Sequence, residues 1–251
     1  MLTLLRVEMM KVRKSAILKL CAVGALCAPV LNWIIALNMQ QQQGTPVAFT
    51  FYMEQSNLFI AMIIGTLLYG LFTTYVFERE FSEGMMKHLL TVPVTRMHLF
   101  TSKLVVVALG MLALTCTAFM GGLVLSLISG FTGMTPDAVL SMGLQYVKAW
   151  AAFLPLMLPV ILITVVFRNF VAPIAFSIIA EIILFVVMQS QYIALYPWSA
   201  PILAGTHILS EAFLEPGLMV GSPSMNLMIL TGFGITTLLL SVMYLKTQDL
   251  T

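Results

Sequence analysis

Six long apolar stretches, almost free of charged residues, dominate this chain of 251 residues. Each has about 18–25 residues, enough at about 1.5 Å per helical residue to cross a hydrocarbon core of about 30 Å. We therefore expect an all-α, polytopic membrane protein with six transmembrane helices in one membrane domain. The predicted spans are about residues 17–37, 57–77, 104–128, 147–167, 171–188 and 226–245.

The positive charges predict how these spans are oriented. Eleven of the 12 Lys and Arg residues fall in alternate segments between the spans, and the opposite segments hold only Lys148. By the positive-inside rule the cation-rich segments face the cytoplasm, so both termini are expected there. The cations of this set are Arg6, Lys11, Arg13, Lys14, Lys19, Arg79, Lys87, Arg96, Lys103, Arg168 and Lys246.

Composition excludes several classes of function. Hydrophobic residues make up 60 % and charged residues 9 % of the chain, against about 45–50 % and about 25 % in ordinary soluble domains. A net charge of +2 without a basic, aromatic-rich run gives no support for a nucleic-acid partner. The chain contains no HExxH motif and no Gly-Lys pair, so it has neither a zinc-protease motif nor a phosphate-binding loop for ATP. We expect no catalytic residue, metal site or cofactor in this chain.

Residues 1–16 predict a short amphipathic helix ahead of the first span. Leu2, Leu5, Met9, Val12 and Ala16 recur at helical spacing, and cations surround the rest of the helix. Such a helix lies in the cytoplasmic membrane interface; the alternative is a frayed basic tail. The outer segments 38–56 and 129–146 predict loops, whereas Arg168 and Asn169 predict a tight cytoplasmic turn.

The outer segment 189–225 predicts a re-entrant hairpin before the last span. Pro197 and Pro201 bracket Trp198, and the following apolar run, 202–214, is too short to cross the membrane. Tryptophan is typical of the membrane interface. A plain outer loop with an aromatic anchor is the alternative interpretation.

The cytoplasmic segment 78–103 is the most charged part of the chain, yet it carries an apolar stripe at helical spacing. Met85, Met86, Leu89 and Leu90 form this stripe, and Pro93 ends the predicted helix. An amphipathic helix in this position needs headgroups or a protein partner to cover its apolar face.

Glu181 is the clearest ionisable residue inside a predicted span. A lone carboxylate in hydrocarbon costs about 2.5–3.5 kcal/mol on insertion scales, so the side chain must face protein or water. Two roles stay open: a structural one within the bundle, or one lining a transport path.

The segment 78–103 resembles that of the ABC-2 class of ABC transporter permeases. An acidic-Gly start, a Leu-Leu pair, a Pro-Val-Thr-Arg turn and a lysine leading into the third span carry the resemblance, and Met85 departs from it where the family often has Thr. The matching residues are Glu83, Gly84, Leu89, Leu90, Pro93, Val94, Thr95, Arg96 and Lys103. The compact length and the Trp-Ser-Ala-Pro segment are most similar to bacterial lantibiotic, bacitracin and other antimicrobial-peptide immunity permeases.

This resemblance implies a mechanism and a set of partners. Two permease subunits, identical or different, would enclose a path for a peptide or hydrophobic small molecule in the bacterial plasma membrane. ABC ATPase subunits, holding ATP and Mg, would dock from the cytoplasm on a coupling helix. The residues implied in this contact are Glu78, Glu83, Gly84, Met85, Met86, Leu89, Leu90, Pro93 and Arg96.

Two other classes of function remain as alternatives. An ion-coupled carrier acting alone would depend on Glu181 and survive ATP depletion. A non-transporting membrane partner of a cytoplasmic ATPase or kinase would bind through the same segment without substrate flux.

Overall fold

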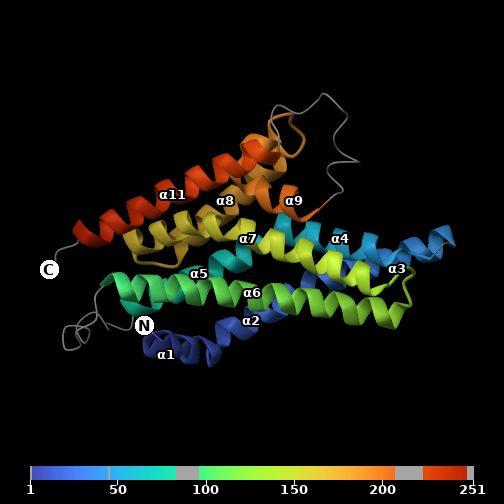
Figure 1. Ribbon diagram of the computed structural model, residues 1–251, viewed down its shortest axis with the longest axis horizontal. Coiled ribbons are helices and arrows are strands. Elements are labelled where there is room, and N and C mark those ends of the chain that lie inside the picture. The colour runs from blue at the N-terminus through green and yellow to red at the C-terminus, as the bar shows by residue number, and fades with distance from the viewer. Residues whose placement is uncertain (1, 45, 83–95, 207–222, 248–251) are drawn as a thin grey trace.

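The computed structural model describes residues 2–44, 46–82, 96–206 and 223–247 as a bundle of long helices (Figure 1). Every regular element in these ranges is helical. The longest are α6 (Arg96–Ser129) and α7 (Pro136–Phe167), which run beside each other along the length of the molecule. At about 1.5 Å per residue, the 34 residues of α6 span about 51 Å.

The N-terminal half forms one side of the bundle. It contains α1 (Leu2–Arg13), α2 (Ala16–Ala25), α3 (Cys27–Gln43), α4 (Phe49–Phe59), the π-helix η1 (Ile60–Ile64) and α5 (Gly65–Ser82). Ser15 caps α2, because its hydroxyl accepts a hydrogen bond from the Leu18 amide at 3.2 Å. Helices α2 and α3 pack on α6, while α5 packs on α6, α7 and α8.

The C-terminal half begins with a tight turn after α7. Arg168 takes a left-handed backbone conformation with φ 51° and reverses the chain into α8 (Val171–Val187), as the Arg168-Asn169 pair predicted. Two short 3-10 turns, η4 (Ile193–Leu195) and η5 (Pro197–Ser199), lead to the short helix α9 (Ala200–Gly205). The last helix, α11 (Pro223–Thr247), packs on α7.

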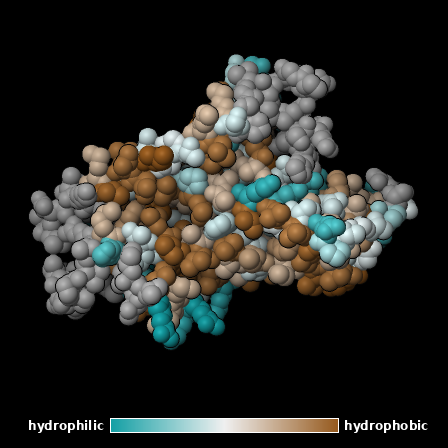
Figure 2. All heavy atoms as spheres, in the orientation of Figure 1, coloured by the Kyte–Doolittle hydropathy of each residue, from teal (hydrophilic) through white to brown (hydrophobic). Residues whose placement is uncertain are grey.

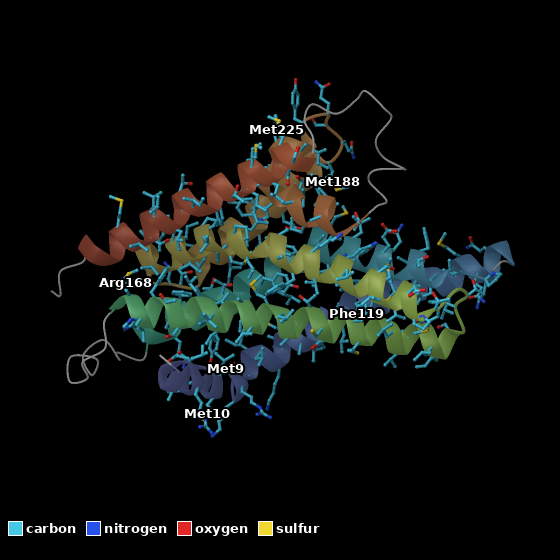
Figure 3. All side chains as sticks on the ribbon, viewed as in Figure 1. Met9, Met10, Phe119, Arg168, Met188 and Met225 are labelled. Carbon is cyan, nitrogen blue, oxygen red and sulfur yellow. The ribbon has the colours of Figure 1, made fainter. Side chains whose placement is uncertain are left out.

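The first helix and the last residues of α11 lie at the same end of the bundle. Figure 1 places α1, the end of α5, the start of α6 and the C-terminal end of α11 together at the left of the view. Arg168 also lies toward this end, whereas Met188 and Met225 lie away from it (Figure 3). The structure thus puts the end of α5, the start of α6, α1, the last residues of α11 and the Arg168 turn toward one end of the bundle.

Among the residues that the structure describes, five helical stretches are long and apolar enough to cross a membrane, and a sixth is shorter. The five cover 16–42, 49–79, 97–129, 136–167 and 224–244, while α8 is apolar but has 17 residues. These helices cover the six predicted apolar stretches. Large hydrophobic side chains are exposed along α3, α6, α8 and α11, and brown apolar residues cover much of the face in Figure 2. The chain is therefore a polytopic, membrane-embedded protein.

Two expectations about the outer segments were wrong in extent. The segment 38–56 is not one loop, since α3 continues to Gln43 and α4 begins at Phe49. Glutamine is a good helix former, so Gln40 to Gln43 prolong the helix until Gly44 ends it with φ 65°. Likewise, α7 already begins at Pro136, where the Thr135 hydroxyl accepts a hydrogen bond from the Ala138 amide at 3.2 Å.

The apolar face expected on the N-terminal helix is shifted in the structure. Leu5 and Val12 pack into the core as predicted, but Met9 and Ala16 are exposed. Glu8 takes a buried position instead, and its carboxylate accepts a hydrogen bond from Lys11 at 2.8 Å. The reason is that α1 packs against α6. The face of α1 that this contact buries includes Glu8, whose charge is compensated by Lys11.

Candidate functional site

The segment between α5 and α6 contains most of the residues predicted to contact an ATPase. Glu83, Gly84, Met85, Met86, Leu89, Leu90 and Pro93 lie outside the residues that the structure describes. Glu78 lies near the end of α5 and is buried, and Arg96 is the first residue of α6. The structure therefore describes the two helical stems from which the segment departs.

A buried lysine joins these two stems. The ammonium of Lys103, in α6, donates a hydrogen bond to the backbone carbonyl of Val76, in α5, at 2.7 Å. Only 2 % of Lys103 is exposed, and its Nζ also lies 5.3 Å from the centre of the Phe77 ring. Phe77 in turn meets the Phe100 ring edge to face at 5.7 Å. The end of α5 and the start of α6 are thus held together by a charged hydrogen bond next to two packed aromatic rings.

Close packing continues along α5 and α6 toward the centre of the bundle. A Cβ placed on Gly110 would lie 2.2 Å from two atoms of the Phe72 ring, so only glycine allows this approach. One turn before Phe72, the Tyr69 hydroxyl and Thr115 Oγ1 are hydrogen-bonded at 2.8 Å. Polar and steric fits therefore fix α5 against α6 over several turns.

The predicted hairpin before the last span is a buried, folded-back segment. Trp198 is 4 % exposed and lies among Phe176, Tyr196 and Phe233, with ring centres 5.6–5.9 Å apart. Pro201 and its neighbours in α9 are also buried, against α7. Pro197 is the first residue of η5 and Pro201 is the second residue of α9. Both prolines lie in the first turn of a helix, where the backbone amide has no partner within the helix, so the missing N–H group costs nothing. The rest of the expected run, 207–214, lies outside the described residues.

Two asparagines that the sequence analysis did not single out hold this segment in place. Asn226 Nδ2, at the start of α11, lies within hydrogen-bond distance of the carbonyls of Ala194 and Tyr196 and of Ser199 Oγ, at 2.9–3.2 Å. Asn57 Nδ2, in α4, donates to the Gly205 carbonyl at 2.7 Å. The available signal was their position, since amide side chains within apolar stretches need partners.

Glu181 lies on α8 at its contact with α5. Its carboxyl group is buried, with 5 % of the residue exposed. The neighbouring hydroxyl of Tyr196 donates to the Ala180 carbonyl at 2.7 Å, which ties the folded-back segment to the same turn of α8. Within this chain the structure places Glu181 inside a helix–helix contact.

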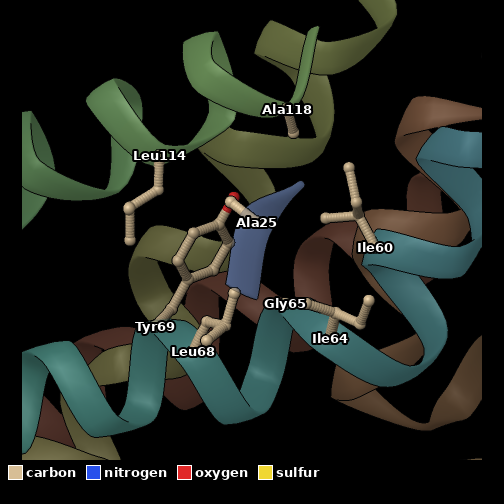
Figure 4. A pocket seen from close by; sticks show the side chains of 8 residues that line it. All are labelled: Ala25, Ile60, Ile64, Gly65, Leu68, Tyr69, Leu114 and Ala118. Atoms are coloured by element: carbon tan, nitrogen blue, oxygen red, sulfur yellow. The ribbon is translucent and has the colours of Figure 1, made fainter. Parts of the chain in front are cut away.

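A small cavity lies beside the π-helix η1, between α2, α5 and α6 (Figure 4). Its lining is apolar except for the Tyr69 hydroxyl, and its volume is about 10 Å³, about what one water molecule needs. This cavity cannot hold a peptide or a drug. Its lining residues are Ala25, Ile60, Ile64, Gly65, Leu68, Tyr69, Leu114 and Ala118.

Over the described ranges, no group of three or more His, Cys, Asp or Glu side chains comes together in a way that would hold a metal ion. The three cysteines, Cys21, Cys27 and Cys116, are free thiols.

Comparison with known proteins identifies the family. The family model described as "ABC-2 family transporter protein" matches residues 4–187, which includes segment 78–103 and Glu181. The chain is also similar to the bacitracin transport permease protein BCRB of Bacillus licheniformis, with 37 % identity over 155 residues, 62 % of this chain and 74 % of that protein. No solved structure matches significantly. The chain therefore belongs to the ABC-2 family of transporter proteins and is a membrane permease subunit of an ABC transporter.

Proposed function

We propose that this chain is the permease of an ATP-driven exporter that removes antimicrobial peptides or hydrophobic drugs and so protects a bacterial cell. The observation that carries the proposal is the 37 % identity to a permease named for bacitracin transport. It works in the plasma membrane with six crossings and both termini in the cytoplasm. The arrangement of the chain ends and the Arg168 turn at one end of the bundle supports this orientation.

Segment 78–103 is the proposed docking site for the ATPase, which would hold ATP and Mg. Its apolar residues Met85, Met86, Leu89 and Leu90 would be buried in the partner, and charged residues such as Glu78 and Arg96 would lie at the rim. The contact between Lys103 and the Val76 carbonyl supports a mechanical role. Two stems joined by a buried charged hydrogen bond move together, so a push on the segment reaches α5 and α6 as one unit.

The transport path is proposed to lie between two permease subunits. The cavity beside η1 holds no more than about one water molecule. Apolar side chains exposed along α3, α8 and α11 are available to lipid or to a second subunit. A second copy of this chain or a sister permease would complete the path.

The test is the double substitution Leu89→Asp with Leu90→Asp. Burying two unpaired carboxylates is unfavourable, so the double variant should no longer co-purify with the ATPase and should lose peptide resistance. The matched control is His88→Asp with Thr91→Asp, which adds the same charge beside the apolar stripe and should retain most of the binding.

Retention of both the ATPase and resistance by the Leu89/Leu90 variant would contradict the docking site. Peptide efflux that survives ATP depletion would indicate an ion-coupled carrier instead. ATPase binding without any flux in reconstituted vesicles would indicate a non-transporting membrane partner.

A further inference from the structure

The contact between α5 and α8 contains several buried polar side chains. Thr66 and Gly70 contribute from α5, and Ser177 and Glu181 contribute from α8, one helical turn apart on each side. A Cβ on Gly70 would lie 2.5 Å from Ser177 Oγ, so the two helices approach closely here. Thr66, Ser177 and Glu181 are all buried.

The hydrogen bonds of this contact do not account for all of its polar atoms. Ser177 Oγ donates to the Pro173 carbonyl at 2.9 Å and is satisfied. Both carboxyl oxygens of Glu181 and the hydroxyl of Thr66 are buried without a hydrogen-bond partner. Thr66 lies next to the carboxyl group, close enough to interact with it, but the two groups do not form a hydrogen bond of normal length and angle. The Thr66 hydroxyl oxygen and the two carboxyl oxygens of Glu181 thus lie in the same buried contact without a normal hydrogen bond.

No charge compensates Glu181 among the described residues. It forms no ion pair with any of them. The elements packed on α8 are α5, α7, η1 and η5, and the titratable group that faces the carboxyl from them is Tyr196. The Tyr196 hydroxyl already donates to the Ala180 carbonyl. A carboxylate here would be a buried, unpaired charge, which is strongly unfavourable.

A π-helical turn precedes α5 and packs on α8 near this contact. The π-helix η1 ends one residue before α5 begins, and the Gly65 amide bonds to the Ile60 carbonyl, five residues earlier. Ala61 of η1 packs in one cluster with Leu184, one turn beyond Glu181 on α8. Single π-helical turns are frequent at functional sites, because they break the regular backbone register.

We infer that Thr66 and Glu181 form a buried site that binds one proton and one water molecule, with Glu181 present as a neutral carboxylic acid. The proton removes the uncompensated charge and turns one carboxyl oxygen into a donor. A water between the carboxyl group and the Thr66 hydroxyl finds three polar partners, the number typical of buried water. A metal cation fits less well, since oxygen-liganded cations such as Ca²⁺ take about 6–8 ligands and this place offers three.

The inference concerns the chain alone and does not depend on the ATPase or the transported molecule. Its test is infrared difference spectroscopy on the full chain in lipid nanodiscs at neutral pH, comparing wild type with Glu181→Gln. The wild type should show the carbonyl stretch of a protonated carboxylic acid, shifted in heavy water and absent from the variant. Asp137→Asn, at the exposed start of α7, is the control and should leave that band in place.

Thr66→Val tests the water-binding half of the site and provides a second subtraction if Glu181→Gln is not recovered. Loss of the hydroxyl should shift the acid band to higher frequency, because the carboxyl group loses a hydrogen-bonded neighbour, without removing it. An unchanged band in Thr66→Val would exclude the shared water. A difference spectrum with only carboxylate bands at neutral pH, or one that changes when sodium is replaced by a large organic cation, would overturn the proton site.

Discussion

Two buried ionisable residues pack against α5 from different helices, Lys103 from α6 and Glu181 from α8, and their surroundings differ. On the α6 side, the ammonium of Lys103 donates a hydrogen bond to the Val76 carbonyl and lies over the Phe77 ring. On the α8 side, neither carboxyl oxygen of Glu181 has a hydrogen-bond partner. The α5–α6 contact therefore contains a charged group with a hydrogen-bond partner, whereas the α5–α8 contact contains a carboxyl group without one.

This difference in hydrogen bonding indicates which of the two helix–helix contacts is the more stable one. A satisfied buried charge holds its helices in one register, because separating them exposes two groups that fit each other. An unsatisfied polar group gives no such penalty, since opening the contact lets water reach it. We expect α5 and α6 to move as a unit and α8 to be the neighbour against which they shift.

The largest effect should come from Gly110→Ala, on the fastened side. The new methyl group would overlap the buried Phe72 ring, which lies 2.2 Å from the Cβ position. Overpacking of this kind costs about 3 kcal/mol at its upper range, which thermal unfolding in detergent would report. Gly232→Ala is the matched control, because nothing lies within 4 Å of its Cβ position, and it should be neutral or slightly stabilising. Equal melting temperatures for the two variants would contradict the tight α5–α6 fit.

Lys103→Met should follow, with a loss of about 2 kcal/mol for a hydrogen bond to a charged group. The methionine keeps most of the side-chain volume, so the loss reports the ammonium and its contact with the Val76 carbonyl. Lys148→Met replaces an exposed lysine on α7 and should change stability by less than about 0.5 kcal/mol. If both variants unfold at the wild-type temperature, Lys103 does not fasten the stems.

Gly70→Ala tests the other side of α5 and should cost less, about 1 kcal/mol. The new methyl group meets Ser177 Oγ at 2.5 Å, but that hydroxyl can rotate if it gives up its bond to the Pro173 carbonyl. Measured beside Gly110→Ala, this variant compares the two contacts directly. A loss larger than that of Gly110→Ala would reverse the ranking proposed here.

Glu181→Gln should have the smallest effect on stability, below about 0.5 kcal/mol, because the amide resembles a neutral carboxylic acid in size and polarity. Glu181→Lys, by contrast, should prevent recovery of folded protein, since it places an unpaired cation in the same space. A strong loss of stability in Glu181→Gln would show that the native side chain is a charged partner in the contact.

The sequence was sufficient for the long elements and insufficient for their ends. Uninterrupted apolar runs specify helices such as α6 and α11 without further information, because a backbone in lipid must bond to itself. The ends depend on local rules that the apolar pattern does not contain. Gln40 to Gln43 extend α3 until Gly44, and Thr135 caps α7, which begins 11 residues before the predicted span.

The candidate sites show the same limit more clearly. Glu181 and Trp198 stood out in the sequence because charge and tryptophan are rare in apolar stretches. Asn57 and Asn226 gave a weaker signal, and their partners, Gly205 and Ala194 to Ser199, are distant in sequence. The role of Lys103 depends on how α5 and α6 are aligned, which the sequence pattern does not contain. This alignment places the Val76 carbonyl oxygen 2.7 Å from the Lys103 ammonium nitrogen.

Helix α6 runs unbroken from the Lys103 stem to Ser129, and the turn after it is bonded to the turn after α3 through Phe49 and Thr132. No proline interrupts α6. A tilt of α6 as a rigid body would therefore move its two ends in opposite directions and take the start of α4 with it. A small displacement near Lys103 would thus reach the turn at Thr132, at the other end of the helix, through α6 itself.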